Sequence, residues 1–512
     1  MTAIGMTMDE PVVLGQRVET PLRANTLNLF DTTVIATSSV APAYTLAATL
    51  GLLIAAVGLA SPAGILVGFF PVLFIAMAYY YLNKQDPNCG ASYSWVSRTL
   101  NPYIGWMSGW IQLVANVFFC AAAPLLAGAY SMQLLNSFFP NQITSAVANN
   151  KWFIMAFAIL WLALVTFMVA RGIRVTANFQ WLLVFIEVLI VVGYSIVALI
   201  KALSGTPANS FSISWFNVGN LGGLSGVVSG AVLAVFFFWG WDTAANVNEE
   251  SKDADESPGQ AGIISMFILL VIFLLAAVAT QMFLSQQVIS NSSSTILLAL
   301  AQGISASVWI GAVMVLAVLS STVATTQTTL LPSSRLTFSM ARDGVFLPAF
   351  SRVHHSWRTP WVGTIVTAGL SLLVIVLTTG VDAANNLFGK LILDIGLLVA
   401  LYYGITGIAS AWAFRKTLLT SVSRFLFAGL FPLLGGIFLL FIAYALVVPT
   451  NLPLGQSPDW ATSLPVLVMA GVGIPLVILT ALLNRNGFFK RPTVSYVEID
   501  GKVQAAPAGT AV

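Results

Sequence analysis

The chain has 512 residues, of which 58% are hydrophobic and 8% are charged, and its formal net charge is +3. Soluble domains carry about 25% charged residues, so this composition excludes a soluble globular protein, and nothing in it supports nucleic-acid binding. Because about 20 apolar residues cross a bilayer as a helix, the long apolar runs predict an all-α polytopic membrane protein embedded in a lipid bilayer.

The apolar runs predict twelve transmembrane helices. In chain order they cover residues 28–57, 62–82, 103–137, 152–170, 176–200, 225–248, 260–285, 304–334, 360–379, 388–414, 424–448 and 463–483. The segment 1–27 has no long apolar core and is not a cleaved signal peptide. Residues 484–512 form a C-terminal tail, and its part after about residue 492 is polar, rich in small residues and expected to be disordered.

The Lys and Arg residues predict the orientation. With the N-terminus in the cytoplasm, 18 of the 21 fall on the inside, and only Lys151, Lys201 and Lys390 fall outside. Cytoplasmic loops of membrane proteins are enriched in Lys and Arg. The distribution therefore predicts a multi-pass protein of the cytoplasmic membrane with both termini in the cytoplasm.

Two spans are interrupted in their middle. Residues 36–42 of the first span read Ala-Thr-Ser-Ser-Val-Ala-Pro, and a proline inside a helix removes a backbone hydrogen bond. Residues 236–243 of the sixth read Phe-Phe-Phe-Trp-Gly-Trp-Asp-Thr, with a glycine and a carboxylate among large aromatics. These spans run in opposite directions, and matched breaks in two inverted halves indicate a transporter's binding site. Alternatively, Pro42 only kinks its helix and Gly240 only eases helix packing.

Spans five and eight contain polar residues suited to a coupling ion. Between Ser320 and Thr329, eight of ten residues are Ser, Thr or Gln, too many for all to face lipid, and hydroxyls are suitable ligands for a hard cation. Glu187 lies in the middle of span five, where loss of water disfavours its ionised form. Such a carboxyl can carry a proton; alternatively, it stays neutral and hydrogen-bonded to a neighbouring helix.

The other reactive residues give no support to catalysis. Cys89 is expected in a loop and Cys120 within a span, so no disulfide is predicted. Asp31 is expected to cap span one, and Asp394 to pair with Lys390 one helical turn earlier. No His, Cys, Asp and Glu residues occur at metal-ligand or catalytic spacing, so the sequence predicts neither an enzyme nor a bound metal or cofactor.

Three segments carry recognisable motifs. Residues 87–95 and 102–110 are similar to a P-x-x-G-G-x-Y … G-x-x-x-G-W entry to span three. Residues 238–250 are similar to an aromatic-Gly-Trp … Glu-Glu block of span six, and residues 333–348 to an S-S-R … A-R-D-G-x-x-P loop after span eight. In this order, within a twelve-span layout, the segments resemble the amino acid–polyamine–organocation (APC) superfamily of permeases over nearly the whole chain.

The resemblance implies the LeuT-type fold, in which helices 1 and 6 are discontinuous. Residues 28–200 would form the first repeat of five spans, residues 225–414 the inverted second repeat, and residues 424–483 two accessory spans. In that family the broken part of span one binds the substrate carboxylate through backbone amides, and that of span six binds the amino group through carbonyls. Carried over, the implied substrate-binding residues are Thr37, Ser38, Ser39, Val40, Phe236, Phe238, Trp239, Gly240 and Trp241.

The chain departs from the family in several places. The usual G-x-G of span one is absent, so the carboxylate contacts can shift by a few residues. Several relatives have a lysine, thought to replace a sodium ion, where span five has Glu187. The carboxylate can carry a proton, bind a cation with Ser321 and Thr325, or contact a cationic substrate, and the proton is preferred. The Trp239 indole stands where relatives often have a small residue, and it favours a compact or cationic amine.

These observations predict a secondary active transporter of an amino acid or related amine, working by alternating access and preferably by proton symport, with Na+ as the alternative ion. The rival predictions are an amino acid or polyamine antiporter, a non-transporting nutrient sensor and a channel. A channel should show a polar stripe through several spans, whereas polarity here is concentrated in spans one, six and eight. The sequence leaves the substrate, the stoichiometry and the oligomeric state open.

Overall fold

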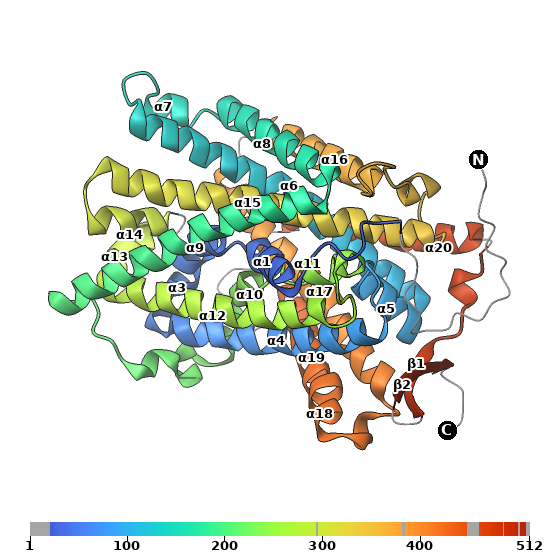
Figure 1. Ribbon diagram of the computed structural model, residues 1–512. Helices are drawn as coiled ribbons and strands as arrows, with labels where there is room; N and C mark the ends of the chain where they lie inside the picture. Colours follow the sequence, from blue (N-terminus) through green and yellow to red (C-terminus); the bar gives the residue numbers. More distant parts are fainter. Residues whose placement is uncertain are drawn as a thin grey trace.

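The computed structural model describes residues 21–292, 295–380, 384–447, 460–484, 486–499 and 502–507. Most of these residues are helical, and the long helices run side by side (Figure 1). Within the described ranges, ten helical segments are long and apolar enough to cross a membrane. The prediction of a helical, polytopic membrane protein is therefore confirmed.

The first part of the chain forms helices α1 to α9. Their bounds are α1 (Leu29–Val40), α2 (Pro42–Thr45), α3 (Gly51–Val57), α4 (Ser61–Gln85), α5 (Ser92–Thr99), α6 (Pro102–Phe138), α7 (Ser145–Ala148), α8 (Lys151–Arg171) and α9 (Ile173–Ser204). The first two predicted spans lie in one helical run, Leu29–Gln85. This run turns at Gly58, whose φ of 61° suits a residue without a Cβ.

The second part forms α10 to α20. Their bounds are α10 (Gly223–Phe237), α11 (Thr243–Asn246), α12 (Ser257–Phe283), α13 (Gln286–Asn291), α14 (Ile296–Ile304), α15 (Val308–Arg342), α16 (Trp361–Gly380), α17 (Ala384–Phe414), α18 (Val422–Arg424), α19 (Phe431–Val447) and α20 (Trp460–Leu483). The predicted sixth span corresponds to α10, which is shorter than predicted, followed by α11. Lys390 is the predicted partner of Asp394, but its side chain is not among those that the structure describes, so this pair stays a prediction.

The first helix breaks where Pro42 predicts it. Ala41 adopts a left-handed conformation with φ 55° and ψ 73°, and Pro42 starts α2. At the other end, the N-cap of α1 is Asn28 and not Asp31 as predicted, but Asp31 takes part in the cap because it forms a reciprocal capping box with Asn28 from the third helical position. The Asp31 carboxylate also accepts hydrogen bonds from Arg174 at 3.0 Å and from the Trp181 indole at 3.1 Å, so α1 is tied to the start of α9.

The predicted second break lies between α10 and α11. Helix α10 ends at Phe237, α11 starts at Thr243, and Gly240 between them has φ 116°. Helix α1 packs on α9, α12 and α15, while α10 packs on α4 and α17. Both interrupted helices thus lie among the longer ones, near the centre of the view in Figure 1.

Helix α15 is longer than the sequence predicts. The S-S-R segment at Ser333–Arg335 was expected in a loop after residue 334, but α15 continues to Arg342. The hydroxyls of Ser333 and Thr337 donate to the carbonyls four residues earlier at 2.9 and 2.8 Å, so each finds a hydrogen-bond partner within the helix itself. The prediction of a loop here was wrong.

The tail after residue 492 was expected to be disordered, and the structure corrects this. Strands β1 (Val494–Ile499) and β2 (Lys502–Pro507) form an antiparallel hairpin at one end of the molecule (Figure 1). The Tyr496 ring is buried against Phe414, with ring centroids 4.8 Å apart. Glu498 pairs with Arg424, and this hydrogen bond lowers the pKa of the Glu498 carboxyl. One buried aromatic therefore anchors a segment whose composition suggested disorder.

Candidate functional site

The two helix breaks touch each other. The hydroxyls of Ser39, near the end of α1, and Thr243, at the start of α11, lie 2.9 Å apart. Gly240 is so close to α1 that a Cβ built on it would lie 2.8 Å from the Ser39 carbonyl oxygen and 2.9 Å from its carbon. A glycine is required here for both its conformation and this approach.

A small pocket opens beside this contact. Its lining comes from α1, α6, the α10–α11 break, α15 and α17, and consists of Ser39, Gln112, Asn116, Trp239, Gly240, Asp242, Thr243, Thr329, Pro332 and Tyr402. Three of the predicted substrate-binding residues, Ser39, Trp239 and Gly240, are among them. The helix breaks thus border the pocket, as expected for a substrate site between two discontinuous helices.

A buried carboxylate, that of Asp242, faces this pocket. Its Oδ1 accepts a hydrogen bond from the Tyr403 hydroxyl at 2.9 Å, and its Oδ2 accepts from the Tyr402 hydroxyl at 3.0 Å. The Gln112 amide is a weaker donor at 3.4 Å. These donors are neutral, so the carboxylate is solvated by dipoles rather than paired with a charge. Such a group can bind an ammonium ion with little change in its surroundings.

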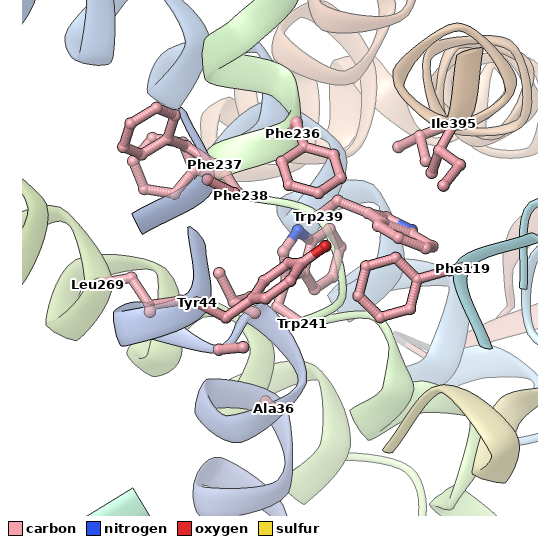
Figure 2. Close-up of a cluster of buried hydrophobic side chains, with 14 of the residues drawn as sticks. Ala36, Tyr44, Phe119, Phe236, Phe237, Phe238, Trp239, Trp241, Leu269 and Ile395 are labelled. Atoms are coloured by element: carbon pink, nitrogen blue, oxygen red, sulfur yellow. The ribbon is translucent and has the colours of Figure 1, made fainter. Parts of the chain in front are cut away.

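Aromatic rings pack around the Trp239 indole, which lines the pocket, whereas the predicted residue Phe236 is not among the lining residues. The Trp239 indole donates to the Tyr402 hydroxyl at 2.8 Å and meets the Phe119 ring edge-to-face at 5.0 Å. Tyr44 and Phe236 complete this group, 6.4 Å apart, and Figure 2 shows the four labelled rings of Tyr44, Phe119, Phe236 and Trp239 around the break after α10. These rings can exclude water around the apolar part of a ligand.

Two predicted aromatic residues lie elsewhere. Phe238 packs against Phe69 and Phe273 at ring distances of 5.3 and 5.4 Å. Trp241 packs against Tyr79 at 4.9 Å and does not line the pocket. Their side chains therefore fix the break in place, while the backbone between them borders the pocket.

The predicted residues of span one have mixed surroundings. Ser38 donates to the side-chain oxygen of Gln180 on α9, and Thr37 is buried. The Val40 carbonyl accepts a hydrogen bond from the Thr45 hydroxyl at 2.6 Å. Of these residues, only Ser39 lines the pocket.

Glu187, Ser321 and Thr325 each contact the chain around the α1–α2 break. Glu187 is fully buried, and its Oε2 lies 3.5 Å from the backbone nitrogen of Ala43. The Ser321 hydroxyl accepts from the backbone N–H of Tyr44 at 3.1 Å, and the Thr325 hydroxyl donates to the Ser39 carbonyl at 2.8 Å. Glu187 Oε1 has no hydrogen-bond partner in the described part of the chain.

The other hydroxyls of the polar stretch in α15 bond mostly to their own helix. Those of Thr322, Thr326 and Thr329 donate to carbonyls four residues earlier at 2.6 to 2.8 Å. Ser321 and Thr325 are different because they contact the α1–α2 break. Ser321 and Thr325, the two residues of this stretch that the sequence analysis selected, are therefore those whose hydroxyls hydrogen-bond to the broken helix.

Sequence reasoning missed several residues of the pocket. Asp242 was noticed only as a charge in span six, and Gln112, Asn116, Tyr402 and Tyr403 were not selected at all. Gln112 and Asn116 are four residues apart, so both lie on one face of α6. Polar residues at helical spacing and a Tyr pair within apolar spans are signals that could have identified them.

Two ion pairs join the segment after α11 to α15. The Arg335 guanidinium binds the Glu250 carboxylate through two hydrogen bonds of 2.9 and 3.0 Å, with both side chains fully buried. Burial raises the pKa of the Glu250 carboxyl, and the guanidinium opposes this shift. Arg342 binds Glu249 in the same two-pronged way at 3.1 and 2.8 Å. These charges neutralise each other and hold the end of the broken helix to α15.

Comparison with known proteins places the chain in a family. It matches the family described as amino acid permease over residues 27–473. It is 26% identical to the low-affinity putrescine importer PlaP of Escherichia coli (strain K12), over 63% of this chain and 68% of that protein. It is also 26% identical to the methylthioribose transporter of Bacillus subtilis (strain 168), over 68% and 75% of the two chains.

A third relative matches over a longer stretch. The arginine/ornithine antiporter of Latilactobacillus sakei is 24% identical over 81% of this chain and 89% of its own length. The family and these relatives are transporters rather than enzymes, and the resemblance carried by the three sequence motifs is confirmed. This multi-pass membrane protein belongs to the amino acid permease family.

Proposed function

We propose that the protein is a secondary active transporter that moves an amino acid or related amine across the cytoplasmic membrane by alternating access. The observation that carries this proposal is the buried Asp242 carboxylate, which faces a pocket between two touching helix breaks. A carboxylate of this kind suits the ammonium group that all these substrates share. Family membership supports the transport activity, and the excess of Lys and Arg in predicted inside loops supports cytoplasmic termini.

The fold proposed for this activity is the LeuT-type inverted repeat with twelve spans. The sharp turn at Gly58 supports two spans in the run Leu29–Gln85, and α10 with α11 supplies the discontinuous sixth. The repeats would cover residues 28–200 and 225–414, and residues 424–483 would add two accessory spans. The breaks at Ala41 and Gly240 support this division because they lie one in each proposed repeat.

The proposed coupling is symport with a proton carried by Glu187. Its carboxyl is buried beside the start of α2 and the Ser321 hydroxyl, so its charge can influence the α1–α2 break directly. Proton transfer would change that charge each time the site is exposed to water. The alternative coupling ion is Na+, bound by oxygens of Glu187, Ser321 and Thr325.

The second candidate is an exchanger. The similarity to an arginine/ornithine antiporter over most of both chains favours it. A non-transporting sensor or a channel on the same scaffold has no comparable support.

Uptake into proteoliposomes tests the proposal. Purified protein is reconstituted, and labelled amino acids and amines are offered with and without an inward proton gradient. Saturable uptake of one class, raised by the gradient, is expected. Flux that requires preloaded substrate would make the protein an exchanger, and a linear, non-saturable flux would contradict a carrier.

Asp242→Asn should abolish saturable uptake, whereas Asp253→Asn, on an exposed loop, should leave it unchanged.

A further inference from the structure

The charge of the pocket indicates which substrates it suits. Among the described residues that line it, Asp242 is the only one with a formal charge, and no Lys, Arg or His is present. A zwitterionic amino acid needs a partner for its carboxylate as well as for its ammonium. The pocket offers a charged partner only for the ammonium.

The backbone N–H groups at the start of α2 are the other candidates for binding a substrate carboxylate, because helix N-termini attract anions. The Ala41 N–H donates to the Ser38 carbonyl at 3.1 Å, and Pro42 has no N–H. The Tyr44 N–H donates to Ser321 at 3.1 Å. The remaining donor, at Ala43, faces the chain's own carboxylate at 3.5 Å. The donors that could hold a substrate carboxylate are therefore used within the protein.

Glu187 adds an electrostatic argument. A substrate carboxylate placed at the start of α2 would share one short stretch of backbone with the Glu187 carboxylate. Like charges at such a distance in a medium of low dielectric repel strongly, or force one group to take up a proton. An anion bound at the start of α2 would therefore disfavour the ionised form of Glu187.

Two polar atoms of the pocket remain without partners in the described part of the chain. They are the Gln112 side-chain oxygen and the Asn116 side-chain nitrogen, both buried. The oxygen is a second acceptor for an ammonium held by Asp242, since Gln112 also donates to that carboxylate. Asn116 supplies a single amide group as donor, whereas three side chains donate to the Asp242 carboxylate, so Asn116 alone falls short of what a buried carboxylate needs.

We infer that the substrate of this site is a small organic amine cation without a carboxylate group. The inference rests on the transporter function proposed above and narrows it. The ammonium would bind the Asp242 carboxylate and the Gln112 oxygen, and the alkyl chain would lie against the Trp239 ring, which lines the pocket. The carboxylate-binding role implied for Thr37, Ser38, Ser39 and Val40 would then be unused in this chain.

The test compares ligands that differ only in a carboxylate. Binding of 1,4-diaminobutane and ornithine to the purified full-length protein is measured by calorimetry, and a second pair is 1,5-diaminopentane and lysine. In each pair the diamine is expected to bind at least about tenfold more tightly. Equal or tighter binding of ornithine and lysine would overturn the inference while leaving an amino acid transporter in place. Absence of saturable uptake for every labelled compound would overturn the transporter proposal as well.

Two variants of Asp242 and one of Glu187 separate recognition from folding. Asp242→Asn should remove diamine binding because it removes the charge and keeps the shape of the side chain, and Asp242→Glu should restore part of the binding because it keeps the charge. Measured at a pH high enough to ionise Glu187, Glu187→Gln should raise the affinity for ornithine relative to 1,4-diaminobutane, because it removes the charge that would repel a carboxylate at the start of α2. If Glu187 has only a structural role, the substitution should change the affinities for ornithine and 1,4-diaminobutane by the same factor. An unchanged ratio of these two affinities would contradict the inference.

Discussion

Replacing Gly240 by alanine tests whether the contact between the two helix breaks supports substrate binding. The residue has φ 116°, and an added Cβ would lie 2.8 Å from the Ser39 carbonyl oxygen. A non-glycine residue in such a conformation costs about 1–3 kcal/mol, and overpacking a filled interior costs about 1–3 kcal/mol more. The expected total is about 2–6 kcal/mol.

This cost should appear mainly in ligand affinity, because the strained contact borders the pocket. At about 1.4 kcal/mol for each factor of ten, Gly240→Ala should weaken binding at least about thirtyfold. The assay is calorimetric titration of the detergent-purified protein with its best ligand. Thermal unfolding of the same samples shows how much of the cost falls on stability instead.

Gly230→Ala, in α10, is the matched control. Its added Cβ would meet the Gly64 Cα at 3.5 Å and a Val57 methyl at 3.7 Å, which are ordinary contacts. Alanine also favours a helix over glycine by up to about 1 kcal/mol, so this variant should bind like the wild type. If Gly240→Ala also bound like the wild type, the breaks would not touch in the binding state, and the reasoning would be refuted.

Three further predictions concern coupling, stability and the C-terminal hairpin. Glu187→Gln should lose pH-driven accumulation but retain exchange, because an amide cannot release a proton; unchanged accumulation in proteoliposomes would contradict its proton-carrying role. Arg335→Met should destabilise the protein by about 3–5 kcal/mol, because it leaves the buried Glu250 unpaired, and adding Glu250→Leu should recover most of the loss in thermal unfolding. A double variant no more stable than the single one would show that the pair matters for another reason. Tyr496→Ala should detach the hairpin, at a cost of about 3 kcal/mol for the lost aromatic packing, and free the backbone at Lys502 from strand pairing so that trypsin cleaves after it; wild-type resistance would contradict this anchoring.

The parts of the fold that follow from local sequence were predictable. Pro42 lacks an N–H, so it ends α1 and starts α2 wherever the surrounding helices lie. Gly240 is the residue of its aromatic run that can adopt φ 116°, and the second break lies there. Apolar runs of sufficient length gave the positions of most long helices, because lipid requires each of them to satisfy its own backbone hydrogen bonds.

Contacts between distant segments were not predictable in the same way. Arg335 lies directly after the predicted end of span eight at residue 334, and its partner Glu250 lies 85 positions away in sequence. Tyr402 and Tyr403 looked like ordinary apolar residues until the fold brought them to Asp242. Tyr496 anchors the hairpin by packing against Phe414, a contact that the composition of the tail does not encode.

The same long-range contacts place two carboxylates on opposite sides of one broken helix. Glu187 faces the start of α2, whereas Asp242 faces the pocket beside Ser39. Ser39 joins the two sides, because its carbonyl accepts from Thr325 at 2.8 Å and its hydroxyl meets Thr243 at 2.9 Å. A movement of α2 that follows a change of charge on Glu187 would therefore reach the pocket through a few short hydrogen bonds. Coupling between ion and substrate requires that both bias the same two-state element; the α1–α2 break meets this requirement, because it contacts Glu187 at Ala43 and borders the Asp242 pocket at Ser39.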